Sequence, residues 1–252
     1  MKATNVLFLM AMAITLEGHA QGFINLDFES AVIVQDASSS FYPNGIYASN
    51  ALPGWIVSVG ATQPSDLLYN TISLGSTSVA LLGTNGVPGS LSGAYSVNLY
   101  GGTTAASASI SQTGLVPAGT QTLIFKAYYF GSPGGTLLVS LGGQELVFAA
   151  LASGSSYTLY GASVASYAGQ VARLTFSAPE GVNNYWTIDD IQFSSQAIPE
   201  PVPLSLFALA ALMLCGWRGW KCAVLTAVDV SLVSHRNIRG DLKCSGSIEA
   251  PL

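Results

Sequence analysis

The feature that most constrains the fold is a series of short segments in which apolar and polar residues alternate, separated by Gly, Pro, Asn and Ser. Alternation with a period of two places the apolar side chains on one face of a β-strand. The segments are residues 25–29, 55–59, 78–82, 95–99, 106–112, 122–129, 137–141, 145–148, 157–160, 171–176 and 186–193. No long amphipathic helix pattern interrupts them. The sequence therefore predicts an all-β domain, a two-sheet antiparallel sandwich with jelly-roll topology, over residues 21–197.

The clearest turn lies in residues 141–145, where Gly142 and Gly143 stand between two candidate strands. Glycine adopts the positive φ angles that a two-residue hairpin turn requires. The sequence predicts a tight hairpin here. We also assign the tryptophans Trp55 and Trp186 to the core.

The predicted domain contains no Cys and no His, because Cys215, Cys222, Cys244, His19 and His235 all lie outside it. This absence excludes disulfides, cysteine nucleophiles, Ser-His-Asp triads and histidine-ligated zinc from the domain.

The charge of the domain is strongly acidic. Its two bases are Lys126 and Arg173, and its acids are Asp27, Glu29, Asp36, Asp66, Glu145, Glu180, Asp189 and Asp190. Binding to nucleic acid needs a basic patch that neutralises phosphates. We therefore expect no nucleic-acid partner.

The first 20 residues have the pattern of a signal peptide. Lys2 is followed by an apolar stretch, residues 6–16, and by the small residues that precede a predicted cleavage before Gln21. The alternative is an uncleaved N-terminal anchor, although the stretch is shorter than the roughly 20 residues of a stable membrane helix. The pattern predicts an exported protein.

The other end of the chain carries Pro199, Glu200 and Pro201, then an apolar span at 204–217 and the basic residues Arg218 and Lys221. This tail, residues 198–221, resembles the PEP-CTERM sorting signal. The resemblance implies a C-terminal hydrophobic helix that holds the exported chain in the membrane until an exosortase, the implied partner, cleaves it. The implied destination is the cell envelope, cell surface or extracellular matrix.

Residues 222–252 have no counterpart in that resemblance, because members of the family end soon after the basic cluster. Two interpretations stay open. The segment is a second membrane-associated stretch, or it is translated past a lost stop codon or a frameshift.

The predicted domain also resembles galactose-binding-like jelly rolls, including carbohydrate-binding modules. The residues that carry this likeness are 25–30, 52–55, 93–97, 109–113, 167–170 and 186–191. Acids on the first and last strands of such folds often hold a structural calcium. The resemblance implies a Ca²⁺ site at Glu29, Asp189 and Asp190, with Asp27 as a helper; the alternative is that these acids face water.

Aromatic side chains offer a platform for sugar rings. The candidates are Phe41, Tyr42, Tyr47, Tyr128, Tyr129, Phe130 and Tyr185, of which we assign Tyr128, Tyr129 and Tyr185 as tentative ligand-binding residues. If residues 128–130 are extended, at least one of them must reach solvent or the rim of the sandwich.

A glycoside-active enzyme would need two carboxylates across a cleft, drawn from Asp66, Glu145, Glu180 and Asp189. Nothing in their spacing selects a pair. Adjacent Asp189 and Asp190 should point to opposite faces of a strand, which argues against a dyad. The sequence therefore predicts a non-catalytic, exported surface or matrix protein, with a carbohydrate-binding module for exopolysaccharide as the alternative.

Overall fold

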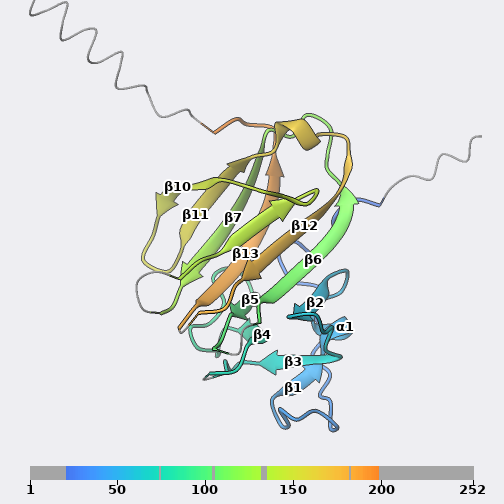
Figure 1. The fold of residues 1–252 in the computed structure, drawn as a ribbon, viewed down its shortest axis with the longest axis vertical. Helices are drawn as coiled ribbons and strands as arrows, with labels where there is room; N and C mark the ends of the chain where they lie inside the picture. Colours follow the sequence, from blue (N-terminus) through green and yellow to red (C-terminus); the bar gives the residue numbers. More distant parts are fainter. Residues whose placement is uncertain (1–20, 74, 104–105, 132–134, 182, 199–252) are drawn as a thin grey trace, which may run out of the picture. The chain divides into compact units, whose positions relative to one another are not determined.

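The computed structural model describes residues 21–198, except 74, 104–105, 132–134 and 182, and shows two β-sheets (Figure 1). The eight-stranded sheet has the order β1 (Gly45–Tyr47), β3 (Asp66–Tyr69), β4 (Ser78–Gly83), β5 (Tyr95–Tyr100), β13 (Tyr185–Ser194), β7 (Thr122–Tyr129), β11 (Thr158–Ser163) and β10 (Phe148–Ser153). The five-stranded sheet has the order β2 (Ile56–Val59), β6 (Ala108–Leu115), β12 (Val171–Ala178), β8 (Leu138–Leu141) and β9 (Gln144–Glu145). The helices in the described part are α1 (Ala48–Ala51) and one 3₁₀ turn (Ala165–Tyr167).

A single large hydrophobic core lies between the two sheets. Phe125 of β7 and Phe176 of β12 are both fully buried, and their rings meet edge to face at 5.2 Å. Trp55 and Trp186, which are 6% and 8% exposed, belong to the same core, as predicted. Burial of apolar surface between the sheets is the main stabilising contribution in a sandwich of this kind.

Most of the predicted strands are present. The prediction for residues 122–129 matches β7 at both ends, and the other matches differ by a few residues. The predicted hairpin at 141–145 joins β8 to β9, with Leu141 paired to Gln144 and with φ of +60° at Gly142 and +80° at Gly143. The two-sheet sandwich is therefore confirmed, and its jelly-roll topology stays a prediction.

The segment at residues 25–29 is a turn, so the strand predicted there is wrong. Asn25 and Phe28 have positive φ, and the indole N–H of Trp55 donates to the carbonyl of Asn25 at 2.9 Å. The Asn25 side chain also accepts the N–H of Ser30 at 2.9 Å. Asn readily forms such local bonds and tolerates the left-handed region, so it favours a turn over a short alternation of five residues.

The predicted strand at residues 145–148 is also wrong, because it spans the break between β9 and β10. Two strands, β1 and β3, were not predicted at all. In β3 the adjacent Leu67 and Leu68 are both buried, one in the main core and one in a small outer cluster with Ala80 and Leu82. A strand covered on both faces shows no alternation.

One pairing departs from the expected antiparallel arrangement. Strands β3 and β4 are parallel, with Leu68 opposite Ala80 and Tyr69 opposite Leu81. The other strand pairs of the described part are antiparallel.

The predicted signal peptide, the sorting motif at Pro199, Glu200 and Pro201 with its hydrophobic helix, and the extension at 222–252 lie outside the described residues. Within the described part, no helix has the length and apolar character needed to span a bilayer.

Candidate functional site

The outer face of the eight-stranded sheet, turned away from the five-stranded sheet, carries polar side chains that are buried. Ser96 and Asn98 of β5 and Thr187 of β13 are each at most 1% exposed and alternate with core residues on the same strands. The Nδ2 of Asn98 donates to Oγ1 of Thr187 at 3.1 Å. Residues 84–94, which we call the covering loop, bond to this face at Ser96 and Asp189.

Asp189 fixes the covering loop to the sheet. Its carboxylate is 1% exposed, and its Oδ2 accepts the Ser96 hydroxyl at 2.7 Å and the Ser92 N–H at 2.8 Å. Its Oδ1 accepts the Asp190 N–H at 2.6 Å. Burial raises the pKa of Asp189 from 3.8 to about 6, even though these hydrogen bonds favour the charged form. The Ser96 hydroxyl in turn accepts the Leu91 N–H at 2.7 Å.

The expected alternation fails at Asp190. The register passes from Asp189 opposite Lys126 to Gln192 opposite Ile124, so β13 contains one extra residue at this point. Asp190 has a φ of +48°, which is typical of a β-bulge. Its Oδ2 lies 3.0 Å from Nζ of Lys126. The expectation that the two aspartates point to opposite faces is therefore wrong, because the bulge brings the second carboxylate to the lysine opposite the first.

Lys126 links Asp190 to the covering loop. Its ammonium donates to Oγ of Ser92 at 3.0 Å and lies 5.0 Å from the ring centroid of Tyr157. Burial lowers the pKa of Lys126, but the bond to Asp190 and the nearby negative charge outweigh it and raise the pKa overall. Burial acts to raise the pKa of Asp190, and hydrogen bonds from Gln192 and Lys126 bring it below its usual value.

Glu29 holds the far end of the covering loop. Its Oε1 accepts the N–H groups of Ala94 and Tyr95 at 2.8 and 3.1 Å. A side chain at Gly93 would collide with this carboxylate, and the φ of Gly93 is +54°. Glycine at position 93 therefore allows the loop to approach Glu29.

The predicted calcium ligands do not form a cluster in this structure. In the described part, no group of three or more His, Cys, Asp or Glu side chains lies close enough to hold a metal ion. Asp189 and Glu29 face N–H and O–H donors, and Asp190 faces an ammonium. These surroundings fit carboxylates held by the protein itself and do not fit a cation that needs free oxygen ligands. The calcium site stays a prediction.

The three tyrosines assigned to ligand binding do not share one surface. Tyr185 is 5% exposed, stacks on Tyr100 with ring centroids 3.9 Å apart, and donates its hydroxyl to the Ser73 carbonyl at 3.0 Å. Burial raises the pKa of its phenol. Tyr129 packs against Trp186 in the core.

The remaining aromatic residues of this region differ in exposure. Tyr128 is half-buried and lies on the same face of β7 as Lys126. Phe130 is 41% exposed, which confirms that at least one residue of 128–130 reaches solvent. Binding of a ligand by Tyr128, Tyr129 or Tyr185 stays a prediction.

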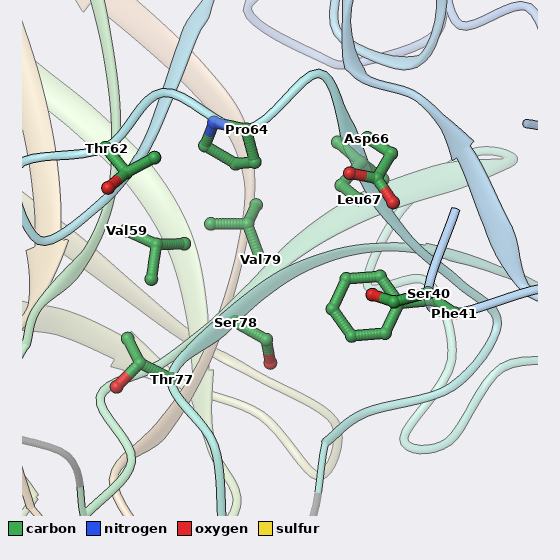
Figure 2. Close-up of a pocket in the computed structure, with 10 residues that line it drawn as sticks. All are labelled: Ser40, Phe41, Val59, Thr62, Pro64, Asp66, Leu67, Thr77, Ser78 and Val79. Carbon is green, nitrogen blue, oxygen red and sulfur yellow. The ribbon is translucent and has the colours of Figure 1, made fainter. Parts of the chain in front are cut away.

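A pocket of about 350 Å³ lies where β2 of one sheet meets β3 and β4 of the other (Figure 2). Its apolar lining comes from Val59, Pro64, Leu67 and Val79. The pocket is at the end of the sheet where β13 begins, because Ser78 of its lining pairs with Tyr100, which pairs with Tyr185.

The pocket also has an aromatic ring and a carboxylate. Figure 2 shows Phe41 and Asp66 on one side of the space and Thr62 on the other. Phe41 is 38% exposed, whereas most large apolar side chains of the domain are buried. Ser40 and Ser78 add hydroxyl groups to the lining.

Ser39 connects the ring to the carboxylate. The Ser39 hydroxyl donates to Oδ2 of Asp66, and Oγ of Ser39 accepts the N–H of Phe41 at 2.9 Å. The turn that contains Ser39 and Phe41 closes with a bond from the Tyr42 N–H to the Ser39 carbonyl at 3.2 Å, and the next turn closes with a bond from the Asn44 N–H to the Phe41 carbonyl at 2.8 Å. One hydroxyl therefore sets the position of Phe41 relative to Asp66.

Gly45 leaves the space for this contact. A Cβ at position 45 would overlap the side chain of Ser39, and the next nearest atom is Cβ of Phe41 at 3.5 Å. Gly45 is the first residue of β1 and pairs with Leu68 of β3, the strand that carries Asp66. The pairing of β1 with β3 and the absence of a side chain at Gly45 together allow the turn of Ser39 and Phe41 to pack against β3.

Chemically, the arrangement suits recognition of a ligand with an apolar face and hydrogen-bonding groups. Asp66 is the one acid among the ten lining residues, so no second carboxylate of the described chain faces it across the pocket. Acid and base catalysis of glycoside hydrolysis requires two such groups.

Sequence reasoning named Phe41 and Asp66 only within larger sets and missed Ser39, Thr62 and Gly45. The order Ser39, Ser40, Phe41 is a local turn pattern in which a hydroxyl accepts an N–H two residues on. That pattern could have indicated a fixed turn. It could not indicate that the same hydroxyl reaches Asp66, 27 residues away.

No protein-family model matches the sequence, and no curated protein matches it. Among solved structures, the fold is similar to that of TmCBM61 in complex with β-1,4-galactotriose, with a TM-score of 0.43 and 18% identity over 70% of this chain and 99% of that one. It is also similar to the enzymatically active domain of tailspike protein 4 of bacteriophage CBA120, with a TM-score of 0.33 and 16% identity over 56% of this chain and 19% of that one. A third is the secreted serine protease VesC from Vibrio cholerae, with a TM-score of 0.29 and 10% identity over 50% and 26% of the two chains. Likenesses of this level identify no ligand, chemistry or assembly for the present chain.

Proposed function

We propose that the sandwich is a non-catalytic carbohydrate-binding module whose ligand occupies the pocket of Phe41 and Asp66. The observation that carries this proposal is that the exposed ring of Phe41 and the carboxylate of Asp66, which Ser39 holds in place, both line the pocket beside its apolar residues. Sugar rings present C–H faces that pack on aromatic rings, and hydroxyls that donate to carboxylates and serine oxygens. A volume of about 350 Å³ has room for one or two sugar rings.

The absence of catalysis is part of the proposal. Asp66 has no carboxylate partner in the pocket lining, and Asp189, the acid whose pKa burial raises to about 6, is bonded to the covering loop. A buried carboxylate with three donors holds a loop in place and has no access to a substrate.

Binding to a panel of polysaccharides, measured by affinity electrophoresis or calorimetry, tests the proposal. Phe41→Ala should weaken binding by about tenfold or more, because it removes the stacking surface. Phe130→Ala is the matched control, since Phe130 has a similar exposure of 41% and does not line the pocket. Equal binding by the wild type and Phe41→Ala, or no binding to any polysaccharide, would contradict the proposal.

We further propose that the module is exported and sorted to the cell envelope or extracellular matrix through its C-terminal tail. Support for this part comes from the sequence alone: Pro199, Glu200 and Pro201, then an apolar span and the basic Arg218 and Lys221. The implied partner is an exosortase, and membrane attachment precedes cleavage.

Surface display in the native host tests the sorting proposal. A stop codon after Ile198 should abolish display, and a stop codon after Lys221 should preserve it, because the second variant keeps the sorting signal and loses only the extension. Unchanged display after truncation at Ile198 would contradict sorting through the tail.

A further inference from the structure

The charges around the pocket restrict what kind of sugar can occupy it. Asp66 is the one charged residue of the lining. The two bases of residues 21–198 are both engaged elsewhere: Lys126 with Asp190, and Arg173 with the hydroxyl of Ser111 at 2.7 Å. No cation of the described chain is therefore placed to neutralise a carboxylate or sulfate on a ligand.

One oxygen of the Asp66 carboxylate is hydrogen-bonded within the protein, and the other is available to a ligand. Oδ2 accepts the Ser39 hydroxyl, and among the described residues no donor binds Oδ1. Asp66 is half-buried at the edge of the pocket, so its charge is less screened than that of a fully exposed acid. A ligand group that donates hydrogen bonds and carries positive charge is the best complement to this oxygen.

The rest of the pocket requires the positive group to be attached to a ring with an apolar face. Phe41 offers a partly exposed aromatic surface, and Val59 and Val79 line the space beside it. A small inorganic cation would not use these surfaces, and a uronic acid would bring like charge to Asp66. An amino sugar in its protonated form uses both the ring and the carboxylate.

We infer that the pocket selects polysaccharides with free amino sugars, with Asp66 as the specificity-determining residue. The inference rests on the proposed function and names its ligand class. The expected order of affinity is cationic over neutral over anionic sugars. The ammonium of the sugar donates to Oδ1 of Asp66 while its ring packs on Phe41.

Calorimetric titration of the domain with three hexamers tests this order: glucosamine, N-acetylglucosamine and galacturonate. At about pH 6.5 the glucosamine hexamer should bind about tenfold more tightly than the N-acetylated one, and the galacturonate hexamer should bind more weakly than both. Raising the pH to about 9 should remove the preference, because the sugar amine then loses its proton.

Asp66→Asn should reduce the preference for the amine to within about threefold, because it weakens binding of the glucosamine hexamer much more than binding of the N-acetylated one. An unchanged near-UV circular dichroism spectrum and an unchanged urea unfolding midpoint show that the variant is folded. Glu145→Gln is the matched control, since it removes the same charge from the exposed β8–β9 hairpin and should preserve the preference. A preference that persists in Asp66→Asn would overturn the inference in favour of diffuse attraction to an acidic protein. A preference that does not change at about pH 9 would also overturn it, because the preference would then not depend on the charge of the amine.

Two further outcomes separate this inference from the proposed function. Equal binding of the amine and N-acetyl hexamers that Phe41→Ala abolishes would overturn the amino-sugar inference and support the carbohydrate-binding function. Failure of every hexamer and of the polysaccharide panel to bind would overturn both.

Discussion

The outer face of the eight-stranded sheet and the pocket beside β3 use similar residue types in opposite ways. On the outer face, Asp189 and Ser96 are buried under the covering loop, and each bonds to a partner in the protein. In the pocket, the Asp66 and Ser39 pair stands beside an exposed ring and open space. The same aspartate and serine chemistry therefore stabilises the fold in the first region and is available to a ligand in the second.

The comparison predicts that changes in the covered region alter stability and leave binding unchanged. The largest effect is expected for Ser96→Ala, which removes a hydroxyl that bonds both Asp189 and the Leu91 N–H. Loss of two buried hydrogen bonds, one of them to a carboxylate, should lower the free energy of unfolding by about 3 kcal/mol. Urea unfolding measures this change, and Ser163→Ala on an exposed position of β11 should change it by less than about 0.5 kcal/mol. A loss of sugar binding in folded Ser96→Ala would show that the two regions are coupled.

The next effect is a dependence of stability on pH that comes from Asp189. Its pKa is raised from 3.8 to about 6 in the folded state, so the folded protein binds more protons than the unfolded chain between these values. The stability that Asp189 contributes is therefore present below about pH 4 and is lost as the pH rises through about 6.

Asp190 acts in the opposite sense, because its pKa is lowered in the folded state and its contribution is lost as the pH falls below its unfolded value. Unfolding curves from about pH 2 to about pH 7 should resolve the two, since Asp190 acts below about pH 4 and Asp189 above it. Asp189→Asn should flatten the slope between about pH 4 and about pH 7. A slope that survives the substitution would assign the titration to another group.

A third effect tests the turn that holds the pocket. Gly45→Ala should displace Ser39, because the added methyl group overlaps its side chain. We expect a loss of about 1 kcal/mol in stability and at least a severalfold loss in binding, since Phe41 and Asp66 are then no longer linked. Gly154→Ala is a suitable control, because the nearest atom to a Cβ there is 3.4 Å away. Full binding by Gly45→Ala would show that the Ser39 link is dispensable.

The smallest effect is expected from a chelator. The carboxylates of Glu29, Asp189 and Asp190 already bond to protein donors, so removal of divalent ions should leave the midpoint of thermal unfolding unchanged. A midpoint that falls with chelator and recovers with Ca²⁺ would instead establish the calcium site that the sequence predicts.

The sequence predicted those parts of the fold in which one face of a strand is buried and the other is not. Strand β7 and the hairpin at Gly142 and Gly143 follow from local patterns, and the structure contains both. Strand β3 was not predicted because Leu67 and Leu68 are buried on opposite faces of the strand, so its sequence does not alternate between apolar and polar residues. The bulge at Asp190 could not be predicted either, since it requires a positive φ at a residue other than glycine.

The candidate site was predictable only as residue types. Phe41 and Asp66 belong to sets that sequence reasoning named for sugar stacking and for acid chemistry. Their proximity depends on pairing between β1 and β3 and on the space at Gly45, and both are long-range consequences of the fold. A local pattern around Ser39 gives no information about such distant contacts.

The length of β13 sets how far the pocket stands from the point where the domain would be tethered. The strand runs from Tyr185, at the end of the sheet that holds the pocket, to Ser194, four residues before Ile198. Ten residues of extended chain measure roughly 33 Å. An attachment that follows Ile198, as the proposed sorting requires, would therefore leave about the length of this strand between the pocket and the last described residues.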